Sequence, residues 1–212
     1  MPEKKKIEKV PLKAKQPFIN EGNGDDKLRC SWSRSTPNLI KYHDTEWGVP
    51  VHDDRKLFEF MILDAFQAGL SWSTILNKRE NFRNAFDNFE AAKISRYTDK
   101  KIEKLINDAG IIRNKMKINA SVSNAKAFLK VQKEYGTFDK FIWQFTGGKT
   151  LYKDRKTAKD IPAKTIESDQ MSKALIEKGF KFVGSTICYA FMQAAGMVHD
   201  HTTDCFRYYK NL

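Results

Sequence analysis

The chain has 212 residues, of which 41 % are hydrophobic and 12 % aromatic, so its composition is that of a globular protein and not of a disordered one. No apolar run approaches the roughly 20 residues that cross a bilayer, and the lysine-bearing N-terminus lacks the apolar segment of a secretory signal. Three cysteines form no even disulfide framework, so we expect a reducing compartment, the cytoplasm.

The net charge of +12 belongs mostly to the part of the chain after residue 28. Residues 1–28 carry seven lysines against five acids and no periodic apolar residues, which predicts a flexible tail before a single domain over residues 29–212. Residues 109–133 hold six basic side chains and no acid. Such a run is either a solvated helix face or a footprint for a phosphate backbone, and charge alone does not distinguish them.

Capping residues and glycines divide the rest into helices. We expect helices over 53–68, ending at Gly69; from Ser71 to about residue 86; from Thr98 to Gly110; and over about 114–135, closed by Gly136. Thr137 begins another helix, residues 146–164 form an exposed connection, and two helices follow at 169–178 and about 185–195. Neither a βαβ alternation nor a strand series is present, which predicts an all-α fold.

Cysteine and histidine are scarce, and four of them form a pattern at the two ends of the domain. Twelve residues separate Cys30 from His43, and His201 lies four residues before Cys205, a spacing that places both on one helical face. Two ligands from each end make a closed set suited to structural zinc, which would join the termini. His199 lies off that shared face. The alternative is that these are ordinary packing residues.

Residues 105–118 predict a helix, a tight glycine turn and a second helix that is basic. Backbone amides at the start of a basic helix bind phosphate, which is how a helix-hairpin-helix element grips DNA. The alternative is an ordinary helical hairpin.

Three of the four tryptophans, Trp32, Trp47 and Trp72, lie close together in sequence around Tyr42. They are either core residues or the walls of a pocket that stacks on an extruded base. Residues 67–71 form a loop between two helices, and an apolar side chain at such a tip can fill the gap that a flipped base leaves. Asp64, in an otherwise apolar helix just before this loop, is either a paired structural acid or the group that reads the base edge.

From Cys30 to Cys205 the chain resembles the DNA-3-methyladenine glycosylase I family, a bacterial branch of the helix-hairpin-helix glycosylases. The resemblance rests on long segments in the same order: RCSW (29–32), YHDTEWGVP (42–50), QAGLSW (67–72), ILNKRENFRNAF (75–86), DAGIIRNKMKI (108–118) and GFKFVGSTICYAFMQAAGMV (179–198).

The resemblance implies roles for individual residues. The zinc ligands correspond to Cys30, His43, His201 and Cys205. Tyr42 and Trp72 correspond to the residues that stack on the base, Trp32 and Trp47 to those that shape the pocket, and Leu70 to the one inserted into the duplex. The hairpin at 108–112 implies contacts with the DNA backbone, which we expect from Gly110, Ile111, Arg113, Lys115 and Lys117.

Asp64 departs from the family, which usually has a glutamate there as the residue that reads the methylated adenine. Aspartate is one methylene shorter, so the base sits deeper, a water bridges the gap, or the base preference has changed. Phe66 stands where a polar residue is common, and it either lines the base pocket to match or faces the core.

We therefore expect a base-excision repair enzyme that flips N3-methyladenine out of duplex DNA and hydrolyses its bond to the sugar, with Asp64 as the catalytic carboxylate. No Schiff-base lysine is evident, so no lyase step is expected. The alternatives are a glycosylase of the same fold for another alkylated purine, such as N3-methylguanine, and a non-catalytic DNA-binding module. A zinc-containing monomer in the bacterial cytoplasm is expected.

Overall fold

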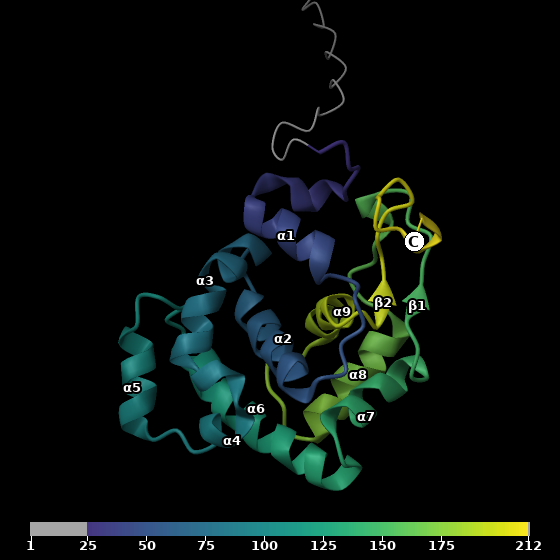
Figure 1. Cartoon of the computed structure of the whole chain (residues 1–212). Helices are drawn as coiled ribbons and strands as arrows, with labels where there is room; N and C mark the ends of the chain where they lie inside the picture. Colours follow the sequence, from purple (N-terminus) through teal and green to yellow (C-terminus); the bar gives the residue numbers. More distant parts are fainter. Residues whose placement is uncertain (1–24, 212) are drawn as a thin grey trace, which may run out of the picture.

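The computed structural model describes residues 25–211, and its fold is mostly helical. The helices gather around α2 (Asp54–Gln67), which packs against α3, α6, α7 and α9 (Figure 1). The elements run η1 (Ser31–Ser35), α1 (Pro37–Thr45), α2, α3 (Trp72–Ala85), η2 (Asp87–Phe89), α4 (Ala91–Ile94), α5 (Asp99–Asn107), α6 (Lys115–Tyr135), α7 (Phe138–Trp143), η3 (Gln144–Thr146), β1 (Leu151–Tyr152), η4 (Ala158–Asp160), α8 (Ile166–Glu177), α9 (Ser185–Ala194), β2 (Val198–His199) and η5 (Tyr209–Asn211).

Helix α2 forms the centre of the core, because every residue from Leu57 to Phe66 is buried. An exposed helix alternates apolar and polar faces, whereas a helix that is apolar on nearly all sides is enclosed by its neighbours. The two acids of this stretch, Glu59 and Asp64, are therefore buried as well. No helix in the described part of the chain is long and apolar enough to cross a membrane.

Side-chain caps start the helices where the sequence predicts them. The cap oxygen of Asp53 accepts from the Lys56 amide at 2.8 Å, and the other expected caps, Ser71, Thr98, Asn114 and Thr137, act in the same way. Helix α8 begins at Ile166, earlier than the expected residue 169, because Thr165 and Ser168 form a reciprocal capping box.

The connection over residues 146–164 is more ordered than the sequence predicts. Strand β1 pairs in parallel with β2, with Leu151 opposite Val198, and a further bridge joins Arg155 to Thr202 (Figure 1). The strictly all-α prediction is corrected by this pair. Strands of two residues have no alternating pattern that a sequence could reveal.

The loop after α1 lies against the end of α9. Gly196 has φ +68°, and a Cβ atom there would lie 2.2 Å from the Val49 carbonyl carbon, so only glycine allows this approach. The amides of Gly48 and Val51 donate to carbonyls of Gln193 and Ala195 at 3.0 and 3.1 Å. This contact brings the N-terminal and C-terminal parts of the domain together.

Residues 1–24 of the expected tail lie outside the described residues. Residues 25–28, also expected in the tail, contact the domain: Asp25 pairs with Arg29 at 2.6 Å, and the Phe206 amide donates to the Leu28 carbonyl at 2.8 Å.

Candidate active site and metal centre

A cavity of about 340 Å³ opens between α1, α2, α3, η4 and α9. Four aromatic side chains and one carboxyl group predicted from the sequence meet in its wall: Trp32, Tyr42, Trp47, Trp72 and Asp64. The volume lies in the range of pockets that hold a small molecule, and a mostly aromatic wall with few polar groups is typical of such pockets.

The aromatic rings of the cavity pack edge to face or at an angle. The ring centroids of Trp32 and Trp47 lie 4.9 Å apart at 73°, and those of Tyr42 and Trp72 lie 5.3 Å apart at 56°. Trp72 is the first residue of α3, so the Ser71 cap determines where its ring stands. Burial raises the pKa of Tyr42 well above its usual value, and the negative charge of Asp64 adds to that effect, so this ring stays uncharged.

Asp64 is 2 % exposed, and its Oδ2 atom has no hydrogen-bond partner among the described residues. Burial raises the pKa of this carboxyl group well above its usual value, although the positive charge of Arg79 acts in the opposite direction. The indole Nε1 of Trp72 also lacks a partner in the part of the chain that the structure describes. Buried polar atoms are almost always paired in proteins, so both atoms are available to a ligand.

Phe66 does not line the cavity, so its expected place in the base pocket is wrong. Its side chain is fully buried, with ring centroids 4.8 Å from Phe82 and 5.8 Å from Phe86. Two residues correspond to about 200° around a helix, which turns Phe66 to the face of α2 opposite Asp64.

Five lining residues were not predicted as pocket residues: Gln67, Ala158, Ile161, Ala190 and Gln193. Gln67 lies within a motif of the resemblance, whereas Ala158 and Ile161 come from the connection that gave no signal. Asp200, which is buried, fixes this side of the wall: its carboxylate accepts from Gln193 and from Arg155, both at 2.9 Å.

The loop between α2 and α3 presents Leu70 beside the cavity. Its side chain is 42 % exposed, one of the few large apolar side chains that reach solvent. Gly69, with φ +80°, makes the turn, and the Leu70 amide donates back to the Gln67 carbonyl at 2.6 Å. The loop therefore carries an exposed apolar side chain directly before the cavity residue Trp72 and its cap Ser71.

The glycine turn between α5 and α6 is tight because Gly110 lies against α3. A Cβ atom on Gly110 would stand 3.0 Å from the Asp108 carboxylate and 3.3 Å from Asn81. The Gly110 amide donates to Asp108 Oδ1 at 2.7 Å, and the Ile111 amide to the Asp108 carbonyl at 3.4 Å.

The backbone amides that follow in this turn have no hydrogen-bond acceptor among the described residues. No described residue accepts from the backbone amides of Ile112 and Arg113, and the side chains of Arg113 and Lys115 are exposed. The backbone donors open to a ligand are therefore those of Ile112 and Arg113, and not those of Gly110 and Ile111 expected from the sequence.

Lys117 has a different place from the phosphate contact expected of it. The residue is 7 % exposed, and its ammonium group donates to the Phe66 carbonyl at 2.9 Å and to the Ala68 carbonyl at 2.6 Å. Burial lowers the pKa of this lysine. Its charge faces the interior and the end of α2.

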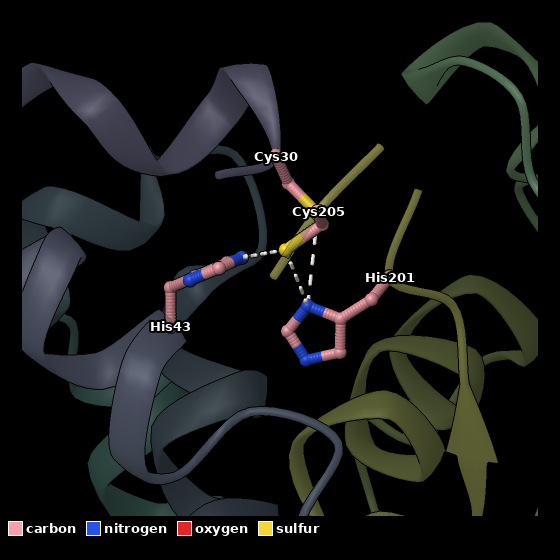
Figure 2. A group of neighbouring side chains, drawn as sticks. All are labelled: Cys30, His43, His201 and Cys205. Atoms are coloured by element: carbon pink, nitrogen blue, oxygen red, sulfur yellow. Dashed lines mark hydrogen bonds between the residues drawn. The ribbon is translucent and has the colours of Figure 1, made fainter. Parts of the chain in front are cut away.

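The four metal-ligand candidates, Cys30, His43, His201 and Cys205, form one buried cluster whose donor atoms all lie within 4.8 Å of one another (Figure 2). Cys205 Sγ lies 3.4 Å from His43 Nε2 and 3.5 Å from His201 Nδ1, and Cys30 Sγ lies 3.7 Å from His201 Nδ1. His199 lies outside the cluster, as expected.

These distances fit a tetrahedral metal. Bonds of about 2.3 Å to sulfur and about 2.0 Å to nitrogen separate the two kinds of ligand by about 3.5 Å. A hydrogen bond between the two thiols lowers the pKa of Cys30, although burial acts against it, and raises the pKa of Cys205, so one thiolate is favoured in the cluster. The segment from His201 to Cys205 is a series of turns, not the helix that the spacing suggested.

Groups behind the cluster orient both histidines. His43 Nδ1 lies 2.8 Å from Asp44, whose carboxylate accepts from Arg29 at 2.8 Å, and His201 Nε2 lies 3.1 Å from the Trp47 carbonyl. Carboxylates and carbonyls in this position are the usual second partners of metal-binding histidines. The cluster thus has the donor set, the burial and the supporting contacts of a closed metal site.

A helical fold that joins an aromatic cavity, a buried carboxyl group and a hairpin before a basic helix fits an enzyme that acts on a base turned out of the DNA stack. The family model described as methyladenine glycosylase matches residues 32–208. The chain belongs to this family.

Individual relatives agree with the family match. The chain is 47 % identical over 180 residues to DNA-3-methyladenine glycosylase 1 of Escherichia coli K12, covering 85 % of this chain and 96 % of the relative. It is 45 % identical over 177 residues to the DNA-3-methyladenine glycosylase of Haemophilus influenzae, covering 84 % and 96 %.

Solved structures are similar as well. A crystal structure of 3-methyladenine DNA glycosylase I superimposes with a TM-score of 0.82 at 47 % identity, covering 85 % of this chain and all of the other. The Staphylococcus aureus enzyme, in a structure that concerns 3-methyladenine recognition, gives a TM-score of 0.81 at 36 % identity, covering 84 % and 94 %.

Proposed function

We propose that this protein excises N3-methyladenine from alkylated duplex DNA by flipping the base into the aromatic cavity and hydrolysing its N-glycosidic bond. The observation that carries the proposal is the buried Oδ2 atom of Asp64, which has no partner among the described residues and borders a cavity walled by Tyr42 and Trp72. Relatives at 45–47 % identity carry the same activity in their names.

Recognition follows from the charge of the damaged base. Methylation at N3 makes adenine cationic while it is attached to the sugar, so aromatic faces and a carboxylate favour it over an undamaged neutral base. Burial raises the pKa of Asp64 and so favours its protonated form. A cationic base beside it favours the ionised form, so entry of the base is coupled to release of a proton.

The bond to the sugar is already weakened by the positive charge, and the base leaves as a neutral molecule. No strong general acid is needed, and a negative Asp64 stabilises the positive charge that develops on the sugar before water attacks. No lysine lines the cavity within the described residues, which supports a glycosylase without a lyase step.

DNA contact is assigned to the hairpin and the loop tip. The amides of Ile112 and Arg113, with the Arg113 and Lys115 side chains, would bind phosphates next to the lesion. Leu70 would fill the gap that the extruded base leaves in the stack. One chain carries all these elements, so a monomer suffices.

The metal cluster is assigned to zinc. Cys30, His43, His201 and Cys205 would hold the ion as four protein ligands, which leaves no position for water and makes the ion structural. It would join the segment before α1 to the segment after β2.

Base release from defined duplexes tests the proposal. Duplexes carrying N3-methyladenine, N3-methylguanine or N7-methylguanine are incubated with the protein, and the freed base is separated and quantified. We expect N3-methyladenine to be released fastest and the abasic strand to stay intact. Release no faster than the spontaneous rate would overturn the proposal.

Faster release of N3-methylguanine would instead favour the alternative substrate. The shorter Asp64 is the observation behind that alternative, since it leaves more depth beside the base than a glutamate would. Phe66 gives it no support, because its ring lies in the core.

A further inference from the structure

We propose that Lys117, assisted by Lys78, is a positioning residue that fixes the DNA-binding hairpin (residues 108–114) to the wedge loop (residues 68–71) and to the end of α2 that carries Asp64. The inference rests on the proposed function, because it explains how the hairpin and the base pocket act on the same nucleotide. Neither lysine touches the cavity.

Lys117 joins the first turn of α6 to the last turn of α2. Its ammonium group donates to the carbonyls of Phe66 and Ala68 at 2.9 and 2.6 Å, and the residue is 7 % exposed. The last carbonyls of a helix have no amide in a following turn, and they carry a partial negative charge. The buried ammonium group supplies the missing hydrogen bonds and a positive charge to these carbonyls, so the end of α2 is fixed to the start of α6.

Lys78 makes the converse connection, from α3 to the hairpin. Its ammonium group donates to the carbonyls of Ala109 and Gly110 at 3.1 and 3.3 Å, and the Asn81 amide donates to the Gly110 carbonyl at 3.2 Å. These bonds turn the carbonyls of the hairpin toward the protein. The amides of Ile112 and Arg113, which no described residue accepts, are left for a ligand.

The wedge loop lies between the two connections, because α2 ends immediately before it and α3 begins immediately after it. One lysine fixes its start to α6, and the other fixes the helix after it to the hairpin. Phosphates bound at the hairpin are thereby held at a set distance from Leu70 and Asp64. Small misplacements of reacting groups cost large factors in rate, so this distance matters for catalysis.

The proposal separates two roles that a lysine can have in this basic segment. An exposed phosphate contact such as Lys115 contributes to the salt dependence of DNA binding, by about 0.9 in the slope of log K against log salt. Lys117 is occupied by two carbonyls and contributes nothing to that slope. It contributes instead to base extrusion after the DNA has bound.

The test compares Lys117→Met, which keeps the length but removes the donors, with Lys115→Met on the same turn. Binding of undamaged duplex is measured over a salt series. Extrusion is measured as 2-aminopurine fluorescence beside the lesion, and base release under single-turnover conditions with saturating protein. For Lys117→Met we expect an unchanged salt slope, with extrusion and release reduced at least tenfold. For Lys115→Met we expect a slope less negative by about 0.9 and near-normal extrusion once bound.

Lys117→Arg keeps a donor and is expected to recover part of the extrusion, which a purely space-filling role would not predict. A salt slope that changes in Lys117→Met as it does in Lys115→Met would overturn the proposal, as would normal extrusion and release. If Lys117→Met does not fold, Lys78→Met decides: extrusion equal to the parent protein overturns the proposal, and a partial loss supports it.

A failure of the proposed function can be told apart from a failure of the inference about Lys117. In that case the parent protein itself does not release N3-methyladenine above the spontaneous rate. The salt slope and the extrusion signal still report on Lys117, because neither requires bond cleavage.

Discussion

The metal cluster and the base cavity share a wall, but they differ in whether their buried polar atoms have hydrogen-bond partners. Trp47 lines the cavity, and its ring lies 4.6 Å from His201 and 6.2 Å from His43 between centroids. On the cluster side both histidines have second partners behind them. On the cavity side Asp64 Oδ2 and Trp72 Nε1 have none in the described part of the chain.

The difference shows where this protein gains stability and where it gives stability up for function. A satisfied buried cluster adds to the free energy of unfolding, while an unpaired buried carboxyl group lowers it until a ligand arrives. Loss of the metal or of one of its ligands should therefore lower the free energy of unfolding, whereas replacement of the unpaired Asp64 on the cavity side should raise it.

Removal of the metal should have the largest effect. Chelation, or the change Cys205→Ala, should lower the free energy of unfolding by about 4 kcal/mol, the amount that a ligand at about a thousand times its dissociation constant contributes. Denaturant unfolding with and without added zinc measures this. Unfolding curves that do not respond to zinc in the parent protein would contradict the metal assignment.

Trp72→Ala should affect the cavity alone. Stacking of one base on an aromatic ring is worth about 1–3 kcal/mol, so single-turnover base release should fall about 5- to 150-fold. Affinity for undamaged duplex should stay the same, because the hairpin is untouched. Equal losses in affinity and in release would instead place Trp72 in general DNA binding.

Asp64→Asn should stabilise the protein at neutral pH while reducing base release. An acid whose pKa is raised on folding loses its proton first in the unfolded chain, so stability falls as pH rises from the ordinary value of 3.8 toward the folded pKa. The free energy of unfolding of the variant does not decrease in this way, because asparagine has no proton to lose in this pH range. Its advantage should be absent below about pH 4 and grow above it, by about 1.4 kcal/mol for each unit of pKa shift.

Unfolding curves of parent and variant between pH 3.5 and about pH 8 measure the difference. Glu46 serves as a contrast, since the charges of Arg79 and Lys56 outweigh its burial and lower its pKa. Glu46→Gln should destabilise the protein near neutral pH. The same sign for both variants would contradict the proposed role of burial at Asp64.

His52→Ala should have the smallest effect. His52 does not line the cavity; its side chain is 57 % exposed, with a 2.7 Å contact to Asp139 and its ring 4.5 Å from Trp143. Exposed pairs contribute about 0.2–1 kcal/mol, so the free energy of unfolding should change by no more than that. Base release should not change, and a loss there would show that effects spread beyond the two regions compared.

Local patterns made most of the helix starts and several of the site residues predictable from the sequence. Ser71 and Thr137 are recognisable caps, and Cys30 and His201 are recognisable candidates for metal ligands because cysteine and histidine are rare in this chain.

Features that depend on tertiary contacts were not predictable. The sequence does not reveal that Lys117, within a basic run, turns inward to the end of α2, or that Ala158 and Ile161 reach the cavity. The parallel pairing of β1 with β2 is set by the same long-range packing. The position of Phe66 is an intermediate case, since helical spacing from Asp64 already places it on the opposite face.

The central claim is that the unpaired carboxyl group of Asp64 reads the damaged base. Titration of free 3-methyladenine into the parent protein and into Asp64→Asn, followed by tryptophan fluorescence and calorimetry, tests it most directly. A hydrogen bond between neutral groups is worth about 0.5–1.5 kcal/mol, so the variant should bind this neutral base about 2- to 12-fold more weakly. Equal affinity in the two proteins would contradict the account.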